Sequence, residues 1–188
     1  MKLLARRSTP APGWNREVVA VYPRRSDVPR EVWRDLFAGA RREIAVLAYA
    51  GMFLAEDDEL MDILARKAAA GVRVQILLGD PGSRQVADRG DDEGINGEMA
   101  ALADAALARH RELLEPRGAQ VRLHQTVLYT SMYLADDEML VNQHVFGVHA
   151  EDAPVMHLRQ GDGLLFGTYR KAVQQVWDGA TAPDAASQ

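Results

Sequence analysis

Cysteine is absent from the 188-residue sequence. Its absence excludes disulfide frameworks, cysteine nucleophiles, zinc ribbons and iron–sulfur centres. Lysine is also scarce, because only Lys2, Lys67 and Lys171 accompany 19 arginines. Any chemistry that requires a lysine therefore has three candidates in the whole chain.

A surplus of positive charge and a long apolar run are missing as well. The 22 basic residues are outnumbered by 27 acidic ones, and the net charge of −5 argues against direct binding to nucleic acid or to an anionic membrane. No apolar run reaches the ~18 residues that span a bilayer. The short apolar start is followed at once by Arg6 and Arg7, which is not the pattern of a signal peptide. We expect a cytoplasmic protein without a membrane partner.

The hydrophobic pattern predicts one α/β domain, which at this length can bury roughly 70% of the unfolded surface. Apolar runs at 44–50 and 72–78, separated by helical periodicity over 60–68, predict a β–α–β unit with parallel strands. Further strands are expected at 18–22, 121–124, 128–134, 139–145 and 155–158, and further helices at 30–41, 98–114 and 166–177. The prediction is an α-β-α sandwich with a mixed sheet over residues 17–178, between a flexible arm (1–16) and a disordered tail (179–188).

A polar connection over residues 82–97 follows the second strand of this β–α–β unit. Its length and its place at the carboxyl end of a parallel strand, where α/β sheets bind ligands, predict a binding loop. Asp80 ends the strand, and Arg84, Arg89 and Glu93 lie on the connection. We expect the two arginines to contact a ligand, because guanidinium groups suit carboxylate or phosphate. The alternative is a solvated loop in which these charges pair with one another.

Five histidines are the remaining candidates for acid–base or metal chemistry. His144 has the strongest case because it lies at the end of the predicted strand 139–145. The others fit positions within helices or strands, or lie in spacings without a metal-binding motif, so no metal and no cofactor are expected.

The segment 118–141 resembles the phospholipase D superfamily, as do the strings at 47–51, 78–81 and 136–142. The layout is most similar to a bacterial group of degenerate phospholipase D-like domains that often follow a helix-turn-helix module. Members of the superfamily carry an HxKxxxxD motif on a hairpin, followed by a GSxN-like segment. Aligned on Asp136, the motif places Tyr129 at the His position, Ser131 at the Lys position and His144 at the Ser of the second segment.

The resemblance implies a phosphate-binding pocket at this hairpin, with Asn142 in the second segment. The aromatic Tyr133 fits the wall of this pocket and the hydrophobic core equally well. In active members the His attacks phosphorus and the Lys binds the phosphoryl oxygens. With tyrosine and serine at these two positions, we do not expect the usual mechanism. If Tyr129 were the nucleophile, its hydroxyl, with a pKa near 10, would need cationic help. Asp136, which would orient the catalytic His in the family, fits a simple hairpin turn equally well.

Three functions fit these features. The first is the binding of a small anionic or phosphorylated ligand in sensing or regulation. The second is an enzyme with altered chemistry in the same cleft, a hydrolase, phosphodiesterase or lyase that uses His144 as general base. The third is a structural dimerisation module. A homodimer is expected under all three, because superfamily members with a single motif commonly pair two chains.

Overall fold

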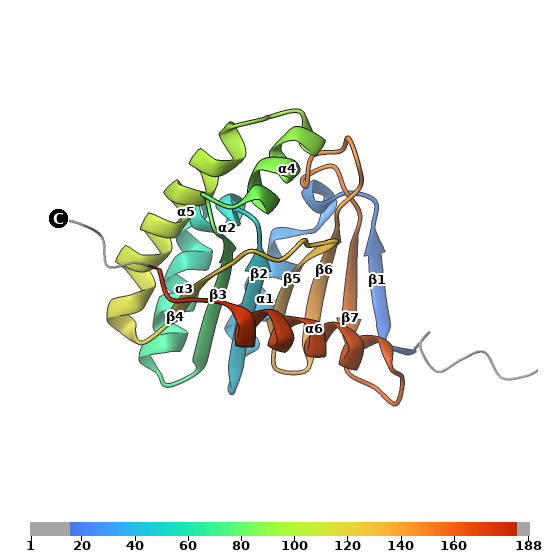
Figure 1. Cartoon of the computed structure of the whole chain (residues 1–188). Helices are drawn as coiled ribbons and strands as arrows, with labels where there is room; N and C mark the ends of the chain where they lie inside the picture. Colours follow the sequence, from blue (N-terminus) through green and yellow to red (C-terminus); the bar gives the residue numbers. More distant parts are fainter. Residues whose placement is uncertain (1–15, 184–188) are drawn as a thin grey trace, which may run out of the picture.

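The computed structural model describes residues 16–183. A seven-stranded sheet with the order β1-β7-β6-β5-β2-β3-β4 crosses the molecule between two layers of helices (Figure 1). The strands are β1 (Val18–Tyr22), β2 (Glu43–Ala48), β3 (Arg73–Gly79), β4 (Gln120–His124), β5 (Thr130–Ala135), β6 (Glu138–Gln143) and β7 (Val155–Arg159). The helices are α1 (Arg30–Gly39), α2 (Met52–Ala55), α3 (Asp58–Ala69), α4 (Arg84–Glu93), α5 (Glu98–Leu114) and α6 (Leu165–Gly179), with two 3-10 turns at Arg25–Asp27 and Glu115–Arg117.

The sheet is mixed, as the sequence predicts. Strands β2, β3 and β4 run parallel, so the expected β–α–β unit is confirmed, while β5, β6, β7 and β1 join antiparallel. The β5–β6 hairpin is also confirmed, with Asp136 and Asp137 in its turn. We call the edge of the sheet where β2, β3 and β4 end the carboxyl edge. The hairpin turn lies at the opposite edge, because β5 runs antiparallel to β2.

Each face of the sheet carries its own hydrophobic core, which confirms the α-β-α sandwich. Along β2, Ile44 and Val46 point into the core under α1, α2, α3 and α5, whereas Ala45 and Leu47 point into the core under α4 and α6. This alternation follows from the two-residue period of a strand. Because both faces are covered, all six residues of β2 are buried, as a continuous apolar run predicts.

The polar connection is not the loop that the sequence predicts. Residues 84–93 form α4, which begins where the Ser83 hydroxyl accepts a hydrogen bond from the Val86 N–H. Val86 is fully buried against the sheet, and Gly90 lets the following chain pack on the helix, since a Cβ there would lie 2.1 Å from the carbonyl oxygen of Asn96. The burial of Val86 and the close packing at Gly90 therefore stabilise a helix in a segment whose composition is typical of a loop.

One contact of the sheet lies beyond residue 178, the predicted end of the domain. Thr181 exchanges two backbone hydrogen bonds with Leu123, at 2.8 and 3.0 Å, and so extends the sheet beyond β4. These bonds pair backbone N–H and C=O groups of the edge strand β4, and they hold Thr181 against the sheet although the composition around it is typical of a tail. The predicted flexible arm lies outside the described residues up to position 15, and the predicted tail lies outside them from position 184.

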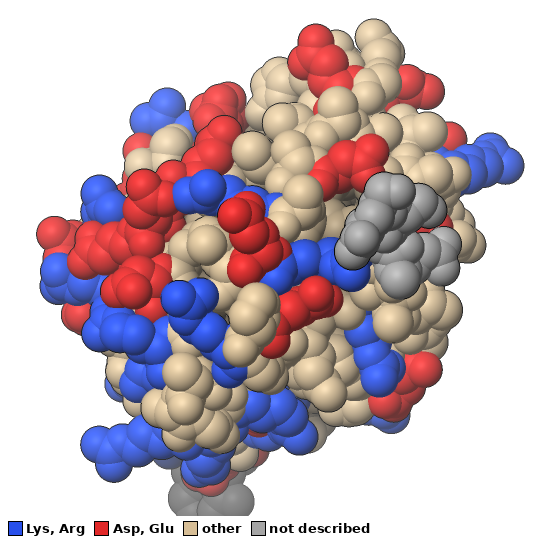
Figure 2. Space-filling view, turned by 90° about the vertical axis from the view of Figure 1, so that its left-hand side faces the viewer, with Lys and Arg blue, Asp and Glu red and all other residues tan. Residues whose placement is uncertain are grey.

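Two surface properties bear on function. Within residues 16–183, no helix combines the length and the apolar character needed to cross a membrane. Lys and Arg lie beside Asp and Glu over much of the side of the molecule shown in Figure 2. That side therefore has no extended surface of a single charge.

Candidate functional site

A cavity of about 250 Å³ opens at the carboxyl edge, on the face of the sheet that α2 and α5 cover. Segments far apart in the sequence build it: the first 3-10 turn, the end of β2, α4, the start of β5 and the loop between β6 and β7. The polar side chains that line it belong to Arg25, Tyr49, Arg89, Glu93, Glu98, Ser131, Tyr133, His144, His149 and Glu151.

His144 is held as a neutral imidazole in the wall of this cavity. Its Nδ1 lies 3.1 Å from the carbonyl oxygen of Leu128, which can only accept, so Nδ1 carries the proton. Burial lowers the pKa of His144 to about 4, and the nearby cation of Arg89 acts in the same direction. Its Nε2 is therefore a hydrogen-bond acceptor near neutral pH.

Ser131 is the partner of this acceptor. Its hydroxyl oxygen lies 2.9 Å from His144 Nε2, so the hydroxyl donates to the imidazole. Ser131 and Tyr133 project from the same face of β5, and the Tyr133 hydroxyl interacts with both Ser131 and Arg25. Burial raises the pKa of Tyr133, and the neighbouring Arg25 and Ser131 oppose this shift.

Arg89 supplies a second cation. It is buried with 6% of its surface exposed and forms an ion pair with Glu93, which His149 approaches from the other side at 3.6 Å. A guanidinium nitrogen of Arg89 also lies 3.5 Å from the carbonyl oxygen of Val148, in the loop above the cavity. The Nε atom of Arg89 is buried and has no hydrogen-bond partner among the described residues. A buried donor left in this state is costly unless something accepts from it.

Tyr49 forms the wall between the cavity and a second hollow on the outer side of α4. Its ring stacks on that of His144, with centroids 5.6 Å apart, and its hydroxyl accepts a hydrogen bond from the Leu128 N–H at 2.8 Å. Burial raises the pKa of Tyr49, so the hydroxyl stays neutral. Tyr49 and Leu128 together fix the orientation of the imidazole.

The other predicted site residues of the hairpin have different positions. Asn142 is fully buried and donates to the carbonyl oxygens of Ala153 and Pro154, so it holds the end of the loop rather than lining the cavity. Tyr129 has 80% of its surface exposed and lies outside the cavity, although its carbonyl oxygen accepts from the His144 N–H.

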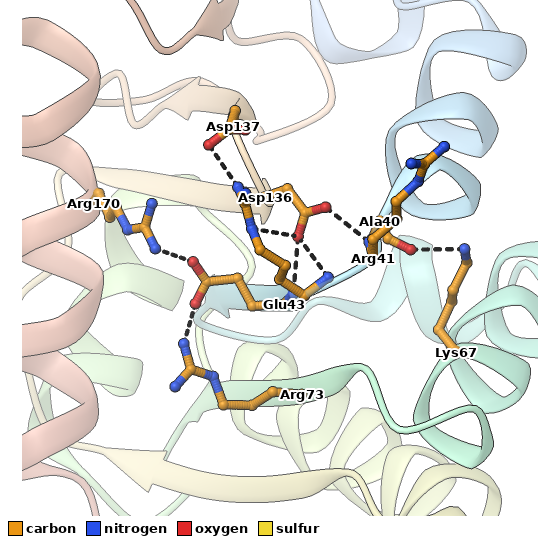
Figure 3. A network of polar contacts seen from close by, with 9 residues as sticks. Ala40, Arg41, Glu43, Lys67, Arg73, Asp136, Asp137 and Arg170 are labelled. Carbon is orange, nitrogen blue, oxygen red and sulfur yellow. Dashed lines mark hydrogen bonds and ion pairs between the residues drawn. The ribbon is translucent and has the colours of Figure 1, made fainter.

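Asp136 lies in the hairpin turn at the opposite edge of the sheet, which is the second of its two predicted positions. Its carboxylate accepts hydrogen bonds from the backbone N–H groups of Arg41, Arg42 and Glu43, at 2.8 to 2.9 Å (Figure 3). Burial alone would raise the pKa of Asp136, but these bonds lower it below the usual value. The residue fastens the hairpin turn to the start of β2.

Two residues expected at the ligand lie elsewhere at the carboxyl edge. Asp80 accepts from the Gln125 side chain at 2.9 Å and from the Gly82 N–H, which stabilises the turn after β3. Arg84 is exposed on α4. Its guanidinium lies 3.3 Å from the carboxylate of Asp88, one turn further along the helix, and the two form a solvent-exposed ion pair. Arg84 corresponds to the alternative in which the charges of the connection pair with one another, whereas Asp80 bonds an uncharged amide and a backbone N–H.

Sequence analysis did not identify Arg25 or His149, and no motif marks either one. Lysine is missing from the cavity lining, and the Lys67 ammonium donates to the carbonyl oxygen of Ala40 at 2.8 Å, near the hairpin turn (Figure 3). Within the described part of the chain, no group of three or more His, Asp or Glu is arranged to hold a metal ion.

Comparison with known proteins identifies the fold. A family model described as "Domain of unknown function (DUF5919)" matches residues 15–182. No curated protein matches the sequence. Among solved structures, phosphatidylserine synthase from Haemophilus influenzae is similar over 89% of this chain and 40% of its own, with a TM-score of 0.61 and 16% identity.

Two further structures have the same fold. NucT from Helicobacter pylori matches 87% of this chain and 98% of its own, with a TM-score of 0.56 and 9% identity. TrmBL2, an archaeal chromatin protein whose structure shows a novel mode of DNA binding, matches 89% of this chain with a TM-score of 0.54 and 15% identity. This chain spans 55% of the length of TrmBL2. At these identities the likeness shows a phospholipase D-like fold and no more.

Proposed function

The chain belongs to the DUF5919 family and has a phospholipase D-like fold, and we propose that its cavity binds a small anionic or phosphorylated ligand in a sensing or regulatory role. One observation carries the proposal. Arg25 and Arg89 both line the cavity, and their charges add to burial in lowering the pKa of His144. The two guanidinium groups therefore make the potential at His144 positive, although the net charge of the chain is −5.

The donors in the cavity suit a tetrahedral anion. Arg25 makes no ion pair with any carboxylate in the described part of the chain, and its guanidinium lies 4.4 Å from the centre of the Phe53 ring. Arg89 has a buried Nε without a partner. A phosphate or sulfate oxygen that accepts from these groups would form charge-assisted hydrogen bonds, which are about twice as strong as neutral ones. Of the carboxylates in the lining, Glu98 and Glu151 are exposed and Glu93 is already paired.

Binding fits the site better than turnover. A general base works best when its pKa lies near the operating pH. The pKa of His144 is about 4, so the imidazole is a weak base near neutral pH. Its hydrogen bonds to Ser131 and Leu128 hold it rigidly, which favours a fixed binding site.

The test is a thermal-shift titration with sodium sulfate and sodium phosphate, against sodium chloride at equal ionic strength. We expect saturable stabilisation by sulfate and phosphate only. Arg25→Gln should abolish it, whereas Arg24→Gln, which removes an exposed neighbouring arginine paired with Asp27, should behave as wild type. Equal responses of the two variants would disprove the proposal. A duplex DNA oligonucleotide belongs in the same screen, and binding that Arg25→Gln leaves unchanged would point to a different nucleic-acid surface.

An enzyme is the second candidate, because the Ser131 hydroxyl is aligned on His144 Nε2 at 2.9 Å. In this alternative His144 takes the proton from Ser131 or from a water as the oxygen attacks the substrate. The test uses bis(p-nitrophenyl) phosphate and p-nitrophenyl acetate, with product release followed by absorbance. Turnover that His144→Gln removes would favour the enzyme over the sensor. Stabilisation by sulfate without turnover of either ester would favour the sensor.

A homodimer is part of the proposal. Val145 and Phe146 follow β6 beside the cavity, and Phe146 has 82% of its surface exposed. Together with Tyr129 they form an apolar rim, of the kind that marks interaction surfaces. Light scattering after size exclusion should give twice the chain mass, and Phe146→Asp should give the monomer. A dimer that binds none of the anions would favour the structural module instead.

A further inference from the structure

A groove separate from both the cavity and the hollow outside α4 lies on the other face of the sheet, between α6 and the segment that joins β4 to β5. Its volume is about 550 Å³, within the range of small-molecule sites. Strand β5 serves both sites, because Ser131 and Tyr133 face the anion cavity while Thr130 and Met132 face this groove. We call it the α6 groove.

The lining of the α6 groove restricts the chemistry of a ligand. None of the residues that line it is charged, so nothing in it would compensate a buried ion. Leu47, Leu128 and Met132 are buried at its floor, and Val127 and Tyr129 are exposed at its rim. Apolar walls with a few polar groups are typical of sites for small organic molecules.

Gln143 supplies a specific polar contact. Its side-chain Nε2 is buried and has no hydrogen-bond partner in the described part of the chain. Its backbone is fully engaged, since the N–H donates to the Pro154 carbonyl oxygen and the carbonyl accepts from the Asn142 side chain. A buried amide donor without an acceptor is destabilising, and an acceptor on a bound molecule would remove that cost.

We propose that the α6 groove binds an uncharged apolar molecule with one acceptor oxygen, such as a ketone, ester or lactone, and that the oxygen accepts from Gln143. The absence of charge from the lining excludes the anions proposed for the cavity. The site does not depend on the function of the cavity, because the sheet separates the two and the groove has no arginine.

The probe for the test is prodan, an uncharged naphthalene ketone that fluoresces more strongly, and at shorter wavelength, in apolar surroundings. Wild type should bind prodan saturably. Ala172→Trp, which places an indole inside the groove, should abolish binding. Gln143→Leu keeps the size of the side chain and removes the donor, so the affinity should fall about fivefold, the equivalent of about 1 kcal/mol for one neutral hydrogen bond. Gln174→Leu is the matched control, since Gln174 is exposed on α6 and bonds Asp178, and it should bind as wild type.

Folding of each variant is checked by circular dichroism, and Gln175→Trp, at an exposed position on the groove rim, replaces Ala172→Trp if that variant does not fold. The proposal is wrong if wild type does not bind prodan, if the tryptophan variant binds it unchanged, or if Gln143→Leu and Gln174→Leu are equal. A dimer that the tryptophan variant dissociates, without prodan binding to wild type, would show that a second copy occupies the groove instead. Sulfate binding is measured in parallel and should be unchanged in every variant.

Discussion

Ser131 lies on β5 and His144 directly follows β6 of the same hairpin, and the hydroxyl of the first lies 2.9 Å from Nε2 of the second. The carbonyl of Leu128 fixes the proton of the imidazole on Nδ1. The serine proton is therefore directed at His144 while the imidazole is neutral. Protonation of Nε2 would reverse this bond and free the serine proton for a ligand, which links the charge of the histidine to anion binding.

Sulfate should bind more tightly as the pH falls from 7 to 5. An anion beside His144 favours the charged imidazole and raises its pKa from the value of about 4 in the free protein, so binding takes up a proton. We expect a several-fold gain in affinity, measured by calorimetry in two buffers of different ionisation enthalpy. Sulfate itself keeps its charge in this range. In His144→Gln the gain and the proton uptake should both disappear, and their persistence would assign them to another group.

The protein should lose stability in the same pH range without ligand. The pKa of His144 in the folded state lies below its unfolded value of 6.5, so the unfolded chain takes up the proton first as the pH falls. The stabilisation is complete above pH 6.5 and is lost towards pH 4. Between pH 7 and 5 this amounts to about 2 kcal/mol. Burial lowers the pKa of His110 and of His124 as well, and both add to the loss.

Urea unfolding at pH 7 and pH 5 measures this loss. The difference in unfolding free energy between the two pH values should shrink by about 2 kcal/mol in His144→Gln. A difference as large as that of wild type would contradict a depressed pKa for His144.

Asp136→Asn should destabilise the fold without affecting the cavity. The substitution removes the charge that accepts from three backbone N–H groups, and hydrogen bonds to a charged group contribute about 2 kcal/mol. Asp137→Asn is the control, because Asp137 is exposed and pairs only with Arg42, so its effect should stay within about 0.5 kcal/mol. Sulfate affinity should be unchanged in both variants. Weaker sulfate binding in Asp136→Asn would show that Asp136 contributes to the anion site.

Glu93→Gln should tighten sulfate binding and weaken the fold. The carboxylate of Glu93 neutralises Arg89 inside the protein, and its removal leaves a buried cation that an anion can pair with. We expect about a tenfold gain in affinity, the order of one partly screened charge. Glu98→Gln removes an exposed carboxylate from the same lining and should change the affinity much less. Equal effects of the two variants would mean that only the overall charge matters.

Much of the fold could be predicted because its elements carry strong local patterns. The apolar runs of β2 and β3 follow directly from burial, and the hairpin follows from two strands on either side of the Asp136-Asp137 turn. Helix α4 was not predicted, because its buried surface comes from Val86 and from the close approach at Gly90, which appear only once the chain has packed on the sheet. Thr181 was missed for the same reason, since its partner Leu123 is 58 positions away.

The candidate site was only partly accessible from the sequence. Ser131 and His144 were found through the resemblance of the hairpin to a known motif. Arg25 was missed because it lies in a short 3-10 turn without any motif, more than 100 residues from the hairpin. Sequence spacing alone did not separate Asp136 from the catalytic position. Six residues of extended strand carry Asp136 about 20 Å away, to the other edge of the sheet.

The sequence by itself determined that cysteine chemistry is excluded, that chemistry requiring a lysine has three candidates, and that the domain is a mixed α/β sandwich. Only the tertiary structure decided which charges share a cavity and which pair in solvent. Periodicity reports the burial of a segment, which is a local property. The potential around His144 depends on distances between groups from four distant segments, and only folding sets those distances.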